Sequence, residues 1–161
     1  MHKKFNEWQA RDYAEKYGLS ITGIRPGNIT GPDKVHGSVD HVQCITLPGR
    51  GRPVEFPYRD MTRLVLHVDD AAAAFRAVLM AERPKHAMYF TGGHPVTLGE
   101  LADIVRDLVP GAQIGFARDD GGRALSGGYR IDNSRILGEF GLRYTPLRET
   151  VAKVLAELRG A

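Results

Sequence analysis

The residues best suited to chemistry in this chain lie in segment 25–32, which reads Arg-Pro-Gly-Asn-Ile-Thr-Gly-Pro. Residues 20–25 are typical of a short strand, so a free amide side chain, Asn28, follows a strand end directly. In open α/β sheets, ligands bind beyond the carboxyl ends of the strands, where glycines let backbone approach a ligand and a few polar groups orient it. The segment therefore fits a ligand-binding loop. An ordinary strand-to-loop exit, with Asn28 capping a turn, fits it equally well.

Cysteine and histidine offer little for metal or redox chemistry. The single Cys44 cannot form a disulfide within the chain, which agrees with a reducing compartment and argues against a cysteine-based metal cage. The six histidines are scattered, and even the closest pair, His36 and His41, is separated by five positions. We therefore expect no metal site.

Composition indicates one globular domain. The 161 residues suffice to bury a core, and 42% are hydrophobic while 25% are charged. No apolar run approaches the ~20 residues of a membrane span, and residues 1–4 lead into a polar helix rather than a signal peptide. We expect a cytoplasmic protein with no membrane partner.

The chain is basic, with a net charge of +3 and a pI near 9.1. Its basic residues are mixed with acids throughout, and only Lys3 and Lys4 are adjacent. No basic stripe is interleaved with aromatic residues. Phosphate on a small molecule explains the excess as well as a nucleic acid does, and we expect no nucleic-acid partner.

The first element that must position these residues is a helix predicted over residues 3–17, ending at Gly18. Its apolar side chains cover roughly two-thirds of the helical wheel, so we expect two of its faces to be covered. Lys3 lies on one stripe with Glu7, whereas Lys4 lies on the charged stripe. Lys3 is thus the lysine expected to point inward.

Helices and strands alternate through the rest of the chain. Patterning predicts further strands around residues 54–56, 64–68, 88–91 and 113–117, and helices over about residues 39–47, 71–81, 98–109, 133–140 and 147–158. The expected N-terminal caps are Ser38, Asp69 with Asp70, Thr97 with Glu100 in a capping box, and Asp132. The helix over 71–81 is apolar almost all round, so we expect it to be buried. The order predicts an α/β class with a largely parallel sheet.

Several motifs occur in a fixed order, and together they point to a known family. They are Lys3-x-x-x-Glu7, Tyr17-Gly18, segment 25–32, Arg63-x-x-x-His67-Val68-x-Asp70-x-Ala72, the strand leading to Gly92-Gly93, and Asp132-x-Ser134-Arg135 followed by Leu137-Gly138 and Gly141. Over essentially the whole chain this set resembles the carboxyl-terminal half of the extended short-chain dehydrogenase/reductases, the NAD-dependent epimerase/dehydratase family.

The resemblance implies a fold and its division. It implies the last strands and helices of a Rossmann-type parallel sheet, at about residues 1–30 and 63–93. The small α/β substrate-binding subdomain would occupy about residues 31–62 and 94–161. Both parts would belong to one domain over residues 1–161.

The resemblance also assigns roles near the cofactor. Lys3 matches the lysine of a Tyr-x-x-x-Lys pair, which holds the nicotinamide ribose and lowers the pKa of the tyrosine, because a nearby cation favours phenolate. Pro26 matches a residue that lies along the nicotinamide, and Asn28 matches one that reaches substrate phosphate or sugar. A surface lysine at a frayed helix end is the alternative for Lys3.

Two further residues match substrate-binding positions of the family, and a third lies near one. Arg63 matches an arginine that binds the diphosphate of a nucleotide-sugar, where a forked guanidinium suits phosphate oxygens; an exposed charge at a strand edge is the alternative. Tyr129 occurs where a substrate-contacting tyrosine is found, and Arg123 is near the expected arginine position, though not at it. His67, Asp70 and Asp132 are expected to be structural.

Two family features are missing. No Gly-x-x-Gly-x-x-Gly loop, whose backbone amides bind the cofactor pyrophosphate, occurs in the chain. No tyrosine has a lysine four residues later, and by spacing the catalytic tyrosine would lie two residues before Met1. We therefore expect that NAD or NADP serves the complete enzyme and that this chain alone binds neither and is inactive.

The leading interpretation is the substrate-binding half of an NAD(P)-dependent nucleotide-sugar epimerase, dehydratase or reductase, acting on a nucleotide-sugar or similar polyol. A free-standing sugar-phosphate-binding module or pseudoenzyme is the alternative, and a truncated chain that pairs with a separate cofactor-binding half is a third. The apolar first helix, together with strand edges left unpaired, predicts a homodimer or association with such a half.

Overall fold

Helices and strands alternate along most of the computed structural model, which describes residues 2–32, 34–118 and 130–160. The helices are α1 (His2–Tyr17), α2 (Asp40–Gly49), α3 (Val68–Met80), α4 (Leu98–Leu108), α6 (Ser134–Phe140) and α7 (Leu147–Arg159). The strands are β1 (Gly23–Arg25), β2 (Asn28–Thr30), β3 (Val54–Tyr58), β4 (Thr62–His67), β5 (Met88–Phe90), β6 (His94–Thr97) and β7 (Ile114–Arg118). The predicted α/β class is confirmed.

Within the described residues the strands pair in three small sheets. β1 pairs in parallel with β5, and β3 in parallel with β7. β4 lies between β2, which is parallel to it, and β6, which is antiparallel. The largely parallel arrangement agrees with the sequence, and β6 is the exception.

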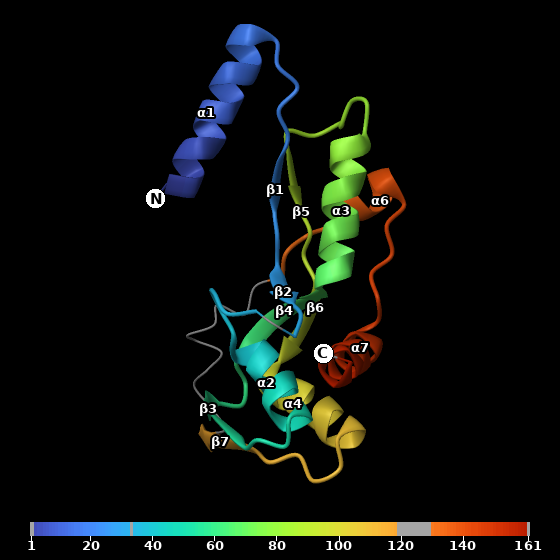
Figure 1. Cartoon of the computed structure of the whole chain (residues 1–161). Helices are drawn as coiled ribbons and strands as arrows, with labels where there is room; N and C mark the ends of the chain where they lie inside the picture. Colours follow the sequence, from blue (N-terminus) through green and yellow to red (C-terminus); the bar gives the residue numbers. More distant parts are fainter. Residues whose placement is uncertain (1, 33, 119–129, 161) are drawn as a thin grey trace.

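Two clusters of buried side chains hold these elements together. The larger packs α2, α4 and α7 against β3, β4, β6 and β7, with Ile45, Leu101 and Val154 fully buried at its centre. The smaller joins α3, β5 and α6 around Tyr89 and Ile136. In Figure 1 the larger cluster lies in the lower part of the molecule and the smaller in the upper part. The connection between them runs along β1–β2 and β5–β6.

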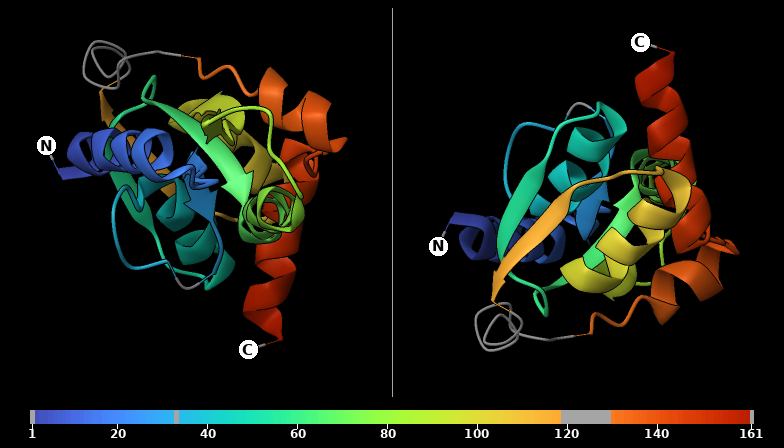
Figure 2. Two further views of the ribbon diagram at one scale, coloured as in Figure 1. Left: turned by 90° about the horizontal axis from the view of Figure 1, so that it is seen from above. Right: turned by 90° about the horizontal axis from the view of Figure 1, so that it is seen from below.

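Helix α1 forms as predicted, but the expected covering of two faces is wrong for this chain by itself. None of its residues is buried, and Trp8 is 68% exposed. Figure 1 shows why: α3 lies along β1 and β5, whereas α1 stands apart on the other side with no further layer over it. Figure 2 shows α1 and α7 on opposite sides of the molecule when viewed from above.

Helix α3 also departs from the expectation of complete burial. Ala71, Ala74 and Val78 are buried, but Leu79 and Met80 are 82% and 70% exposed. Only one face of the helix packs on β5 and α6, and the opposite apolar face has no cover among the described residues. The amphipathic pattern is therefore that of a one-sided helix.

The predicted caps of α2 and α3 are wrong, because both helices begin elsewhere than expected. α2 begins at Asp40 after Val39, without a side-chain cap, and Pro48 lies inside its last turn rather than ending it. α3 begins at Val68, so Asp69 lies in its first turn and the His67 side chain is the cap. Carboxylates in the first turn still favour the helix through its dipole.

The predicted cap of α4 holds, whereas that of α6 does not. Thr97 and Glu100 form the expected capping box at the start of α4. α6 begins at Ser134 after Asn133, whose side chain makes no capping hydrogen bond. Asp132 lies one residue before that position and accepts a hydrogen bond from the backbone N–H of Ser134 at 2.9 Å. Gly141 ends α6 in the left-handed conformation, with φ of 62°.

Segment 25–32 is a crossing between two strands rather than the expected loop. The chain leaves β1 at Arg25, turns at Pro26 and Gly27, and enters β2 beside β4. A Cβ at Gly27 would clash with the backbone carbonyl of Gly92, which exits β5 at the same level. The sequence missed β2 and β6 because each is short and contains or follows proline.

One further property concerns the helices as a group. Of those in the described ranges, none combines the length and apolar character that crossing a membrane requires.

The close approach of backbone at Gly27 predicts that substitution of two glycines will change the free energy of unfolding by very different amounts. Gly27→Ala should lower the free energy of unfolding by more than about 2 kcal/mol, because its Cβ meets backbone that cannot move aside. Gly138→Ala is the matched control, since it lies in α6 with open space around it, and should be neutral or slightly stabilising. Urea unfolding followed by circular dichroism measures both, and equal effects would contradict the proposed close approach.

Candidate functional site

The carboxyl ends of β1 and β5 meet in one place, where Arg25 lies opposite Phe90. The guanidinium of Arg25 stacks over the Phe90 ring at 5.2 Å. It also donates two hydrogen bonds to the carboxylate of Glu7 on α1, through Nε at 2.6 Å and through Nη2. Arg25 thus ties α1 to the end of the parallel strand pair, which is where open α/β sheets bind ligands.

The Glu7–Arg25 pair stays charged near neutral pH. The hydrogen bond from Arg25 holds the pKa of Glu7 below its usual value, and the same bond raises the pKa of Arg25. The sequence could have suggested the partner, because Glu7 shares a helical stripe with Lys3. We name this place, with Lys3, Glu7, Arg25 and Pro26, the strand-end site.

A hollow of about 590 Å³ opens at the strand-end site. Its lining consists of Lys3, Lys4, Asn6 and Glu7 from α1, with Ile24, Arg25 and Pro26 from the strand. Lys3 and Lys4 both line it and both are exposed, so the expectation that only Lys3 points inward is wrong. The reason is that the hollow lies beside the first turn of α1, so the side chains of both neighbouring lysines border it.

The structure therefore brings together Lys3 and Pro26, the two residues that the sequence assigned to the nicotinamide end of a cofactor. Three cationic side chains and one carboxylate surround the hollow, a set that fits ribose hydroxyls and phosphate oxygens. Their role toward a cofactor stays a prediction.

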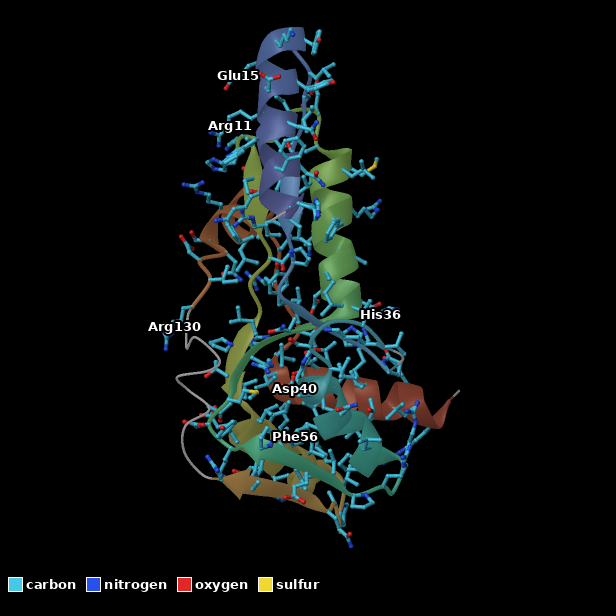
Figure 3. The ribbon with its side chains drawn as sticks, turned by 90° about the vertical axis from the view of Figure 1, so that its left-hand side faces the viewer. Arg11, Glu15, His36, Asp40, Phe56 and Arg130 are labelled. Atoms are coloured by element: carbon cyan, nitrogen blue, oxygen red, sulfur yellow. The ribbon has the colours of Figure 1, made fainter. Side chains whose placement is uncertain are left out.

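A second hollow, of about 390 Å³, has Phe90 in its lining. Arg130, Ile131, Asp132 and Arg135 complete its lining. Sequence reasoning did not single out the two arginines, although Arg135 belongs to the Asp-x-Ser-Arg motif. Figure 3 shows Arg130 at the edge of the molecule, on the opposite side from His36.

Asn28 holds strands together in this structure. Its Oδ1 accepts the backbone N–H of Leu64 at 2.9 Å, so the side chain links the start of β2 to β4. The oxygen that could have met a substrate is thus used inside the fold. Contact between Asn28 and a substrate stays a prediction.

Arg63 lies on β4 in an ion pair with Asp40, the first residue of α2. Its Nε donates to Oδ1 of Asp40 at 2.9 Å and its Nη2 donates to Oδ2, so the two groups form a two-pronged contact. Nη1 donates to the carbonyl of Thr62 at 2.9 Å. Only 16% of the Arg63 side chain and 22% of the Asp40 side chain are exposed. The alternative of a solvated charge at a strand edge does not describe Arg63.

The carboxylate of Asp40 is held in the charged form. Burial by itself favours the neutral acid, but hydrogen bonds from His41 and Arg63 outweigh it and hold the pKa of Asp40 well below its usual range. The backbone N–H of His41 donates to Oδ1 at 2.8 Å. Lys34 lies nearby; burial lowers its pKa, the charge of Asp40 opposes that shift, and Arg63 adds to it. Sequence reasoning missed Asp40 because 23 residues separate it from Arg63.

Two candidate substrate residues, Arg123 and Tyr129, lie outside the described residues. Most of the expected arginine- and glycine-containing loop lies there too. Their contacts with a substrate stay predictions.

Two of the described tyrosines are held as neutral phenols. Burial raises the pKa of Tyr144 to about 12, and the carboxylate of Asp70 adds to the shift. Burial also raises the pKa of Tyr89, whose hydroxyl donates to Glu139 at 2.6 Å. A phenol with a raised pKa is a poor general base near neutral pH. Both shifts run opposite to the lowered pKa that the tyrosine of a Tyr-x-x-x-Lys pair requires.

His67, Asp69 and Glu157 place three donor groups close together, with one ligand atom from each within 4.8 Å of the others. Nδ1 of His67 accepts the backbone N–H of Asp69 at 3.1 Å, so the ring proton of the neutral imidazole is on Nε2. Nε2 faces Glu157 at 3.4 Å, too long for a well-formed hydrogen bond. Because a metal needs the lone pair of Nε2, this arrangement fits a polar contact better than a metal ligand.

Asp70 performs a different structural task from the cap that the sequence predicted. Its carboxylate accepts the backbone N–H of Thr145 at 3.0 Å and the hydroxyl of Thr145 at 3.2 Å. The segment before α7 is thereby fastened to the first turn of α3. The prediction that Asp70 is structural agrees with these contacts.

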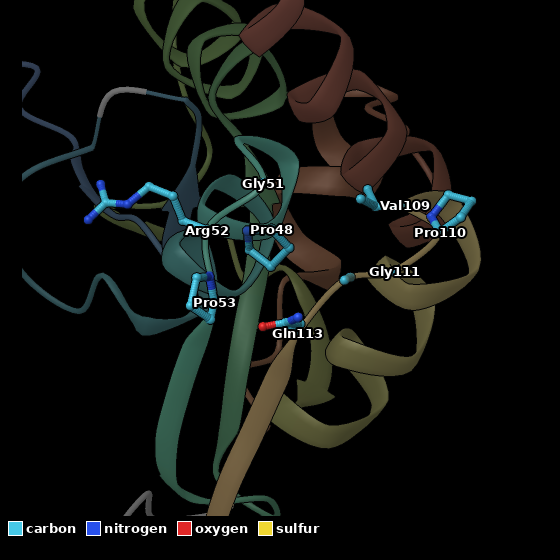
Figure 4. Close-up of a pocket in the computed structure, with 9 residues that line it drawn as sticks. Pro48, Gly51, Arg52, Pro53, Val109, Pro110, Gly111 and Gln113 are labelled. Carbon is cyan, nitrogen blue, oxygen red and sulfur yellow. The ribbon is translucent and has the colours of Figure 1, made fainter.

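One small cavity lies apart from all of these residues. It measures about 160 Å³ and lies between the turn after α2 and the turn after α4. Figure 4 shows prolines and glycines around it, with the charged end of Arg52 extending away from Pro110. Arg52 and Gln113 supply the polar side chains of its lining, and the lining contains none of the residues that the sequence assigned to a site.

Comparison with known proteins extends these observations. A profile of the NAD dependent epimerase/dehydratase family matches residues 1–90. The chain is similar to a partial consensus L-threonine 3-dehydrogenase (E-change), with 25% identity and a TM-score of 0.84 over 99% of this chain and 55% of that one. It is also similar to the holo form of a GalE-like L-threonine dehydrogenase from Cupriavidus necator, with 25% identity and a TM-score of 0.80 over 94% and 52% of the two chains.

A UDP-glucose 4-epimerase from Thermus thermophilus, in complex with NAD, matches with 21% identity and a TM-score of 0.75 over 96% of this chain and 51% of that one. No curated protein matches the chain. The fold is that of the Rossmann-type extended short-chain dehydrogenase/reductases. Because the family profile covers more than half of its residues, the chain belongs to the NAD dependent epimerase/dehydratase family. It spans about half the length of the solved structures that it matches.

The capping role of His67 predicts a graded loss of stability. His67→Ala removes the acceptor for the Asp69 N–H and should lower the free energy of unfolding by about 1–2 kcal/mol. His67→Asn keeps an acceptor suited to a helix cap and should lose less. His36→Ala, at an exposed position, is the control and should change little. Thermal unfolding measures all three, and equal losses for Ala and Asn at position 67 would count against the cap.

Proposed function

We propose that this chain forms the substrate-binding portion of an NAD(P)-dependent epimerase, dehydratase or reductase that acts on a nucleotide-sugar or a similar small polar substrate. Membership of the family supports the reaction class. Among the matched structures, one is a UDP-glucose 4-epimerase in complex with NAD and others are threonine dehydrogenases. Each of them acts on a small polar molecule.

The observation that carries the proposal is the convergence of Lys3, Arg25 and Pro26 around one hollow at the carboxyl ends of β1 and β5. The donor set fits the ribose and phosphate of a nucleotide, since lysine and arginine donate and the proline offers an apolar face. NAD(P), when bound, would remove and return hydride.

Within that chemistry the residues of this chain bind and orient. Lys3 would hold the nicotinamide ribose and lower the pKa of a tyrosine supplied from outside this chain, because a cation favours phenolate. Pro26 would lie along the nicotinamide, and Asn28 and Arg63 would face the substrate. Arg123 and Tyr129 would complete the substrate contacts. That this chain alone binds neither cofactor stays a prediction, as does a cytoplasmic location.

We propose the same division that the sequence indicated, with about residues 1–30 and 63–93 in the Rossmann-type part and about residues 31–62 and 94–161 in the substrate-binding part. The two buried clusters support it, because the smaller contains α3 and β5 and the larger contains α2, α4 and α7. α6 and β4 are exceptions: α6 packs in the smaller cluster although its residues belong to the second part, and Val65 of β4 packs in the larger cluster although it belongs to the first part.

A free-standing sugar-phosphate-binding module is the second candidate. The observation that favours it is the larger cluster, which α2, α4 and α7 close without help from another chain. A module of this kind would bind the same phosphate without chemistry. Binding of a nucleoside diphosphate therefore tests both candidates together.

The test compares UDP binding by the wild-type chain and by a variant at Arg63. Arg63→Ala should weaken binding of UDP roughly tenfold or more, because a charge-assisted contact contributes about 1.5–3 kcal/mol. Arg59→Ala is the control, because Arg59 also pairs with an aspartate, Asp103, but on the exposed surface. Isothermal titration calorimetry on the 161-residue chain measures both. An unchanged dissociation constant for Arg63→Ala would exclude Arg63 from the phosphate site.

The exposed face of α1 generates a prediction about association. Phe5, Trp8, Tyr13 and Tyr17 are all about half exposed or more, and apolar surface of this kind drives association. We expect the chain to elute as a dimer or larger species, and Trp8→Glu to shift it toward monomer. Gln9→Glu adds the same charge at the neighbouring exposed position and should have less effect. Light scattering that shows a monomer unaffected by Trp8→Glu would contradict the prediction.

A further inference from the structure

The phosphate-binding fork expected of Arg63 is already occupied by a carboxylate of the same chain. Nε and Nη2 of Arg63 both donate to Asp40, one to each oxygen. A guanidinium meets a phosphate through the same two-pronged geometry. Asp40 thus stands where an anion of a ligand would bind.

Both partners of the Arg63–Asp40 contact are held in place by further hydrogen bonds. Asp40 is the first residue of α2 and accepts the backbone N–H of His41 at 2.8 Å, which fixes its carboxylate at the helix start. Arg63 is fixed by its bonds to the Thr62 carbonyl and to Sδ of Met61. Little exposure and several fixed partners distinguish it from a surface ion pair.

The charges near the Arg63–Asp40 ion pair determine which charged groups would remain if the pair separated. Asp40 pairs with Arg63, and Lys34 is close enough to be affected by both charges: burial lowers the pKa of Lys34, Asp40 raises it and Arg63 lowers it further. A diphosphate next to the charged Asp40 would meet a like charge at short range, in a place where solvent screens it little. Neutralising Asp40 would leave two cations free to attract an anion.

We propose that Asp40 is a specificity-determining residue, an internal competitor that occupies the fork of Arg63 and selects against a substrate diphosphate at that position. The inference rests on the proposed function, in which Arg63 faces the substrate. A ligand diphosphate must displace Asp40 to reach Arg63. Substrates that carry no phosphate at this position meet no such competition.

Asp40→Asn tests the competition with little disturbance of the fold. The amide keeps the shape of the carboxylate and one oxygen that can accept the His41 N–H, but it loses the negative charge. Calorimetric titration of the 161-residue chain with UDP should show binding about tenfold tighter than wild type. Uridine, which has no phosphate, should bind both proteins equally.

Two control variants locate the effect. Asp103→Asn removes the carboxylate that pairs with Arg59 on the exposed surface and should leave UDP binding unchanged. The double variant Asp40→Asn, Arg63→Ala should lose the gain, because no fork remains to bind the phosphate. Circular dichroism confirms that each variant is folded before titration.

The outcomes separate this inference from the proposed function. If Arg63→Ala weakens UDP binding while Asp40→Asn leaves it unchanged, Arg63 faces the substrate but Asp40 does not compete, and the inference is overturned. If no variant binds UDP at millimolar concentration, both the competition and the phosphate role of Arg63 are wrong. A gain in Asp40→Asn that survives Arg63→Ala would also overturn it, because the phosphate would then bind elsewhere.

Discussion

Close contact between glycine backbone and strand β4 is the constraint on which the rest of the structure depends. β1 continues into β2, and β5 into β6, beside the same stretch of β4, and there is no room for a side chain between them. A Cβ on Gly93 would lie 2.7 Å from the carbonyl of Leu64, and Gly27 faces Gly92 just as closely. Asn28 and Thr91 then fasten the crossing, by accepting the backbone N–H groups of Leu64 and Gly27. Both regions of the candidate site take their positions from it.

The two arginine–carboxylate forks on either side of this crossing differ in what they can do. Arg25 and Glu7 are more exposed, so water screens their attraction and the pair contributes little to stability, although it orients α1 at the strand ends. Arg63 and Asp40 are mostly buried, and separating them would leave charges poorly solvated. A ligand can therefore join the first pair easily, but it must replace a partner in the second.

The uncovered apolar faces of α1 and α3 lie on the upper part of the molecule in Figure 1, around the small sheet of β1 and β5. The larger cluster in the lower part is enclosed by three helices. This contrast accords with a chain that spans about half the length of its matched structures. The lower part of the molecule can bury its own core, whereas the two strands of the upper sheet offer too little surface to cover both helices.

The sequence by itself determined the class of fold, the family and the elements whose signals are local. Periodicity located α1, α4 and α7, the Thr97–Glu100 capping box marked the start of α4, and Gly141 marked the end of α6, because each signal lies within a few residues. Only the tertiary structure decided which charges meet. Arg63 finds Asp40, and Asp70 fastens Thr145 instead of capping a helix, across 23 and 75 residues respectively. Contacts between segments so far apart depend on how strands cross and helices pack, and no local pattern of residues records that.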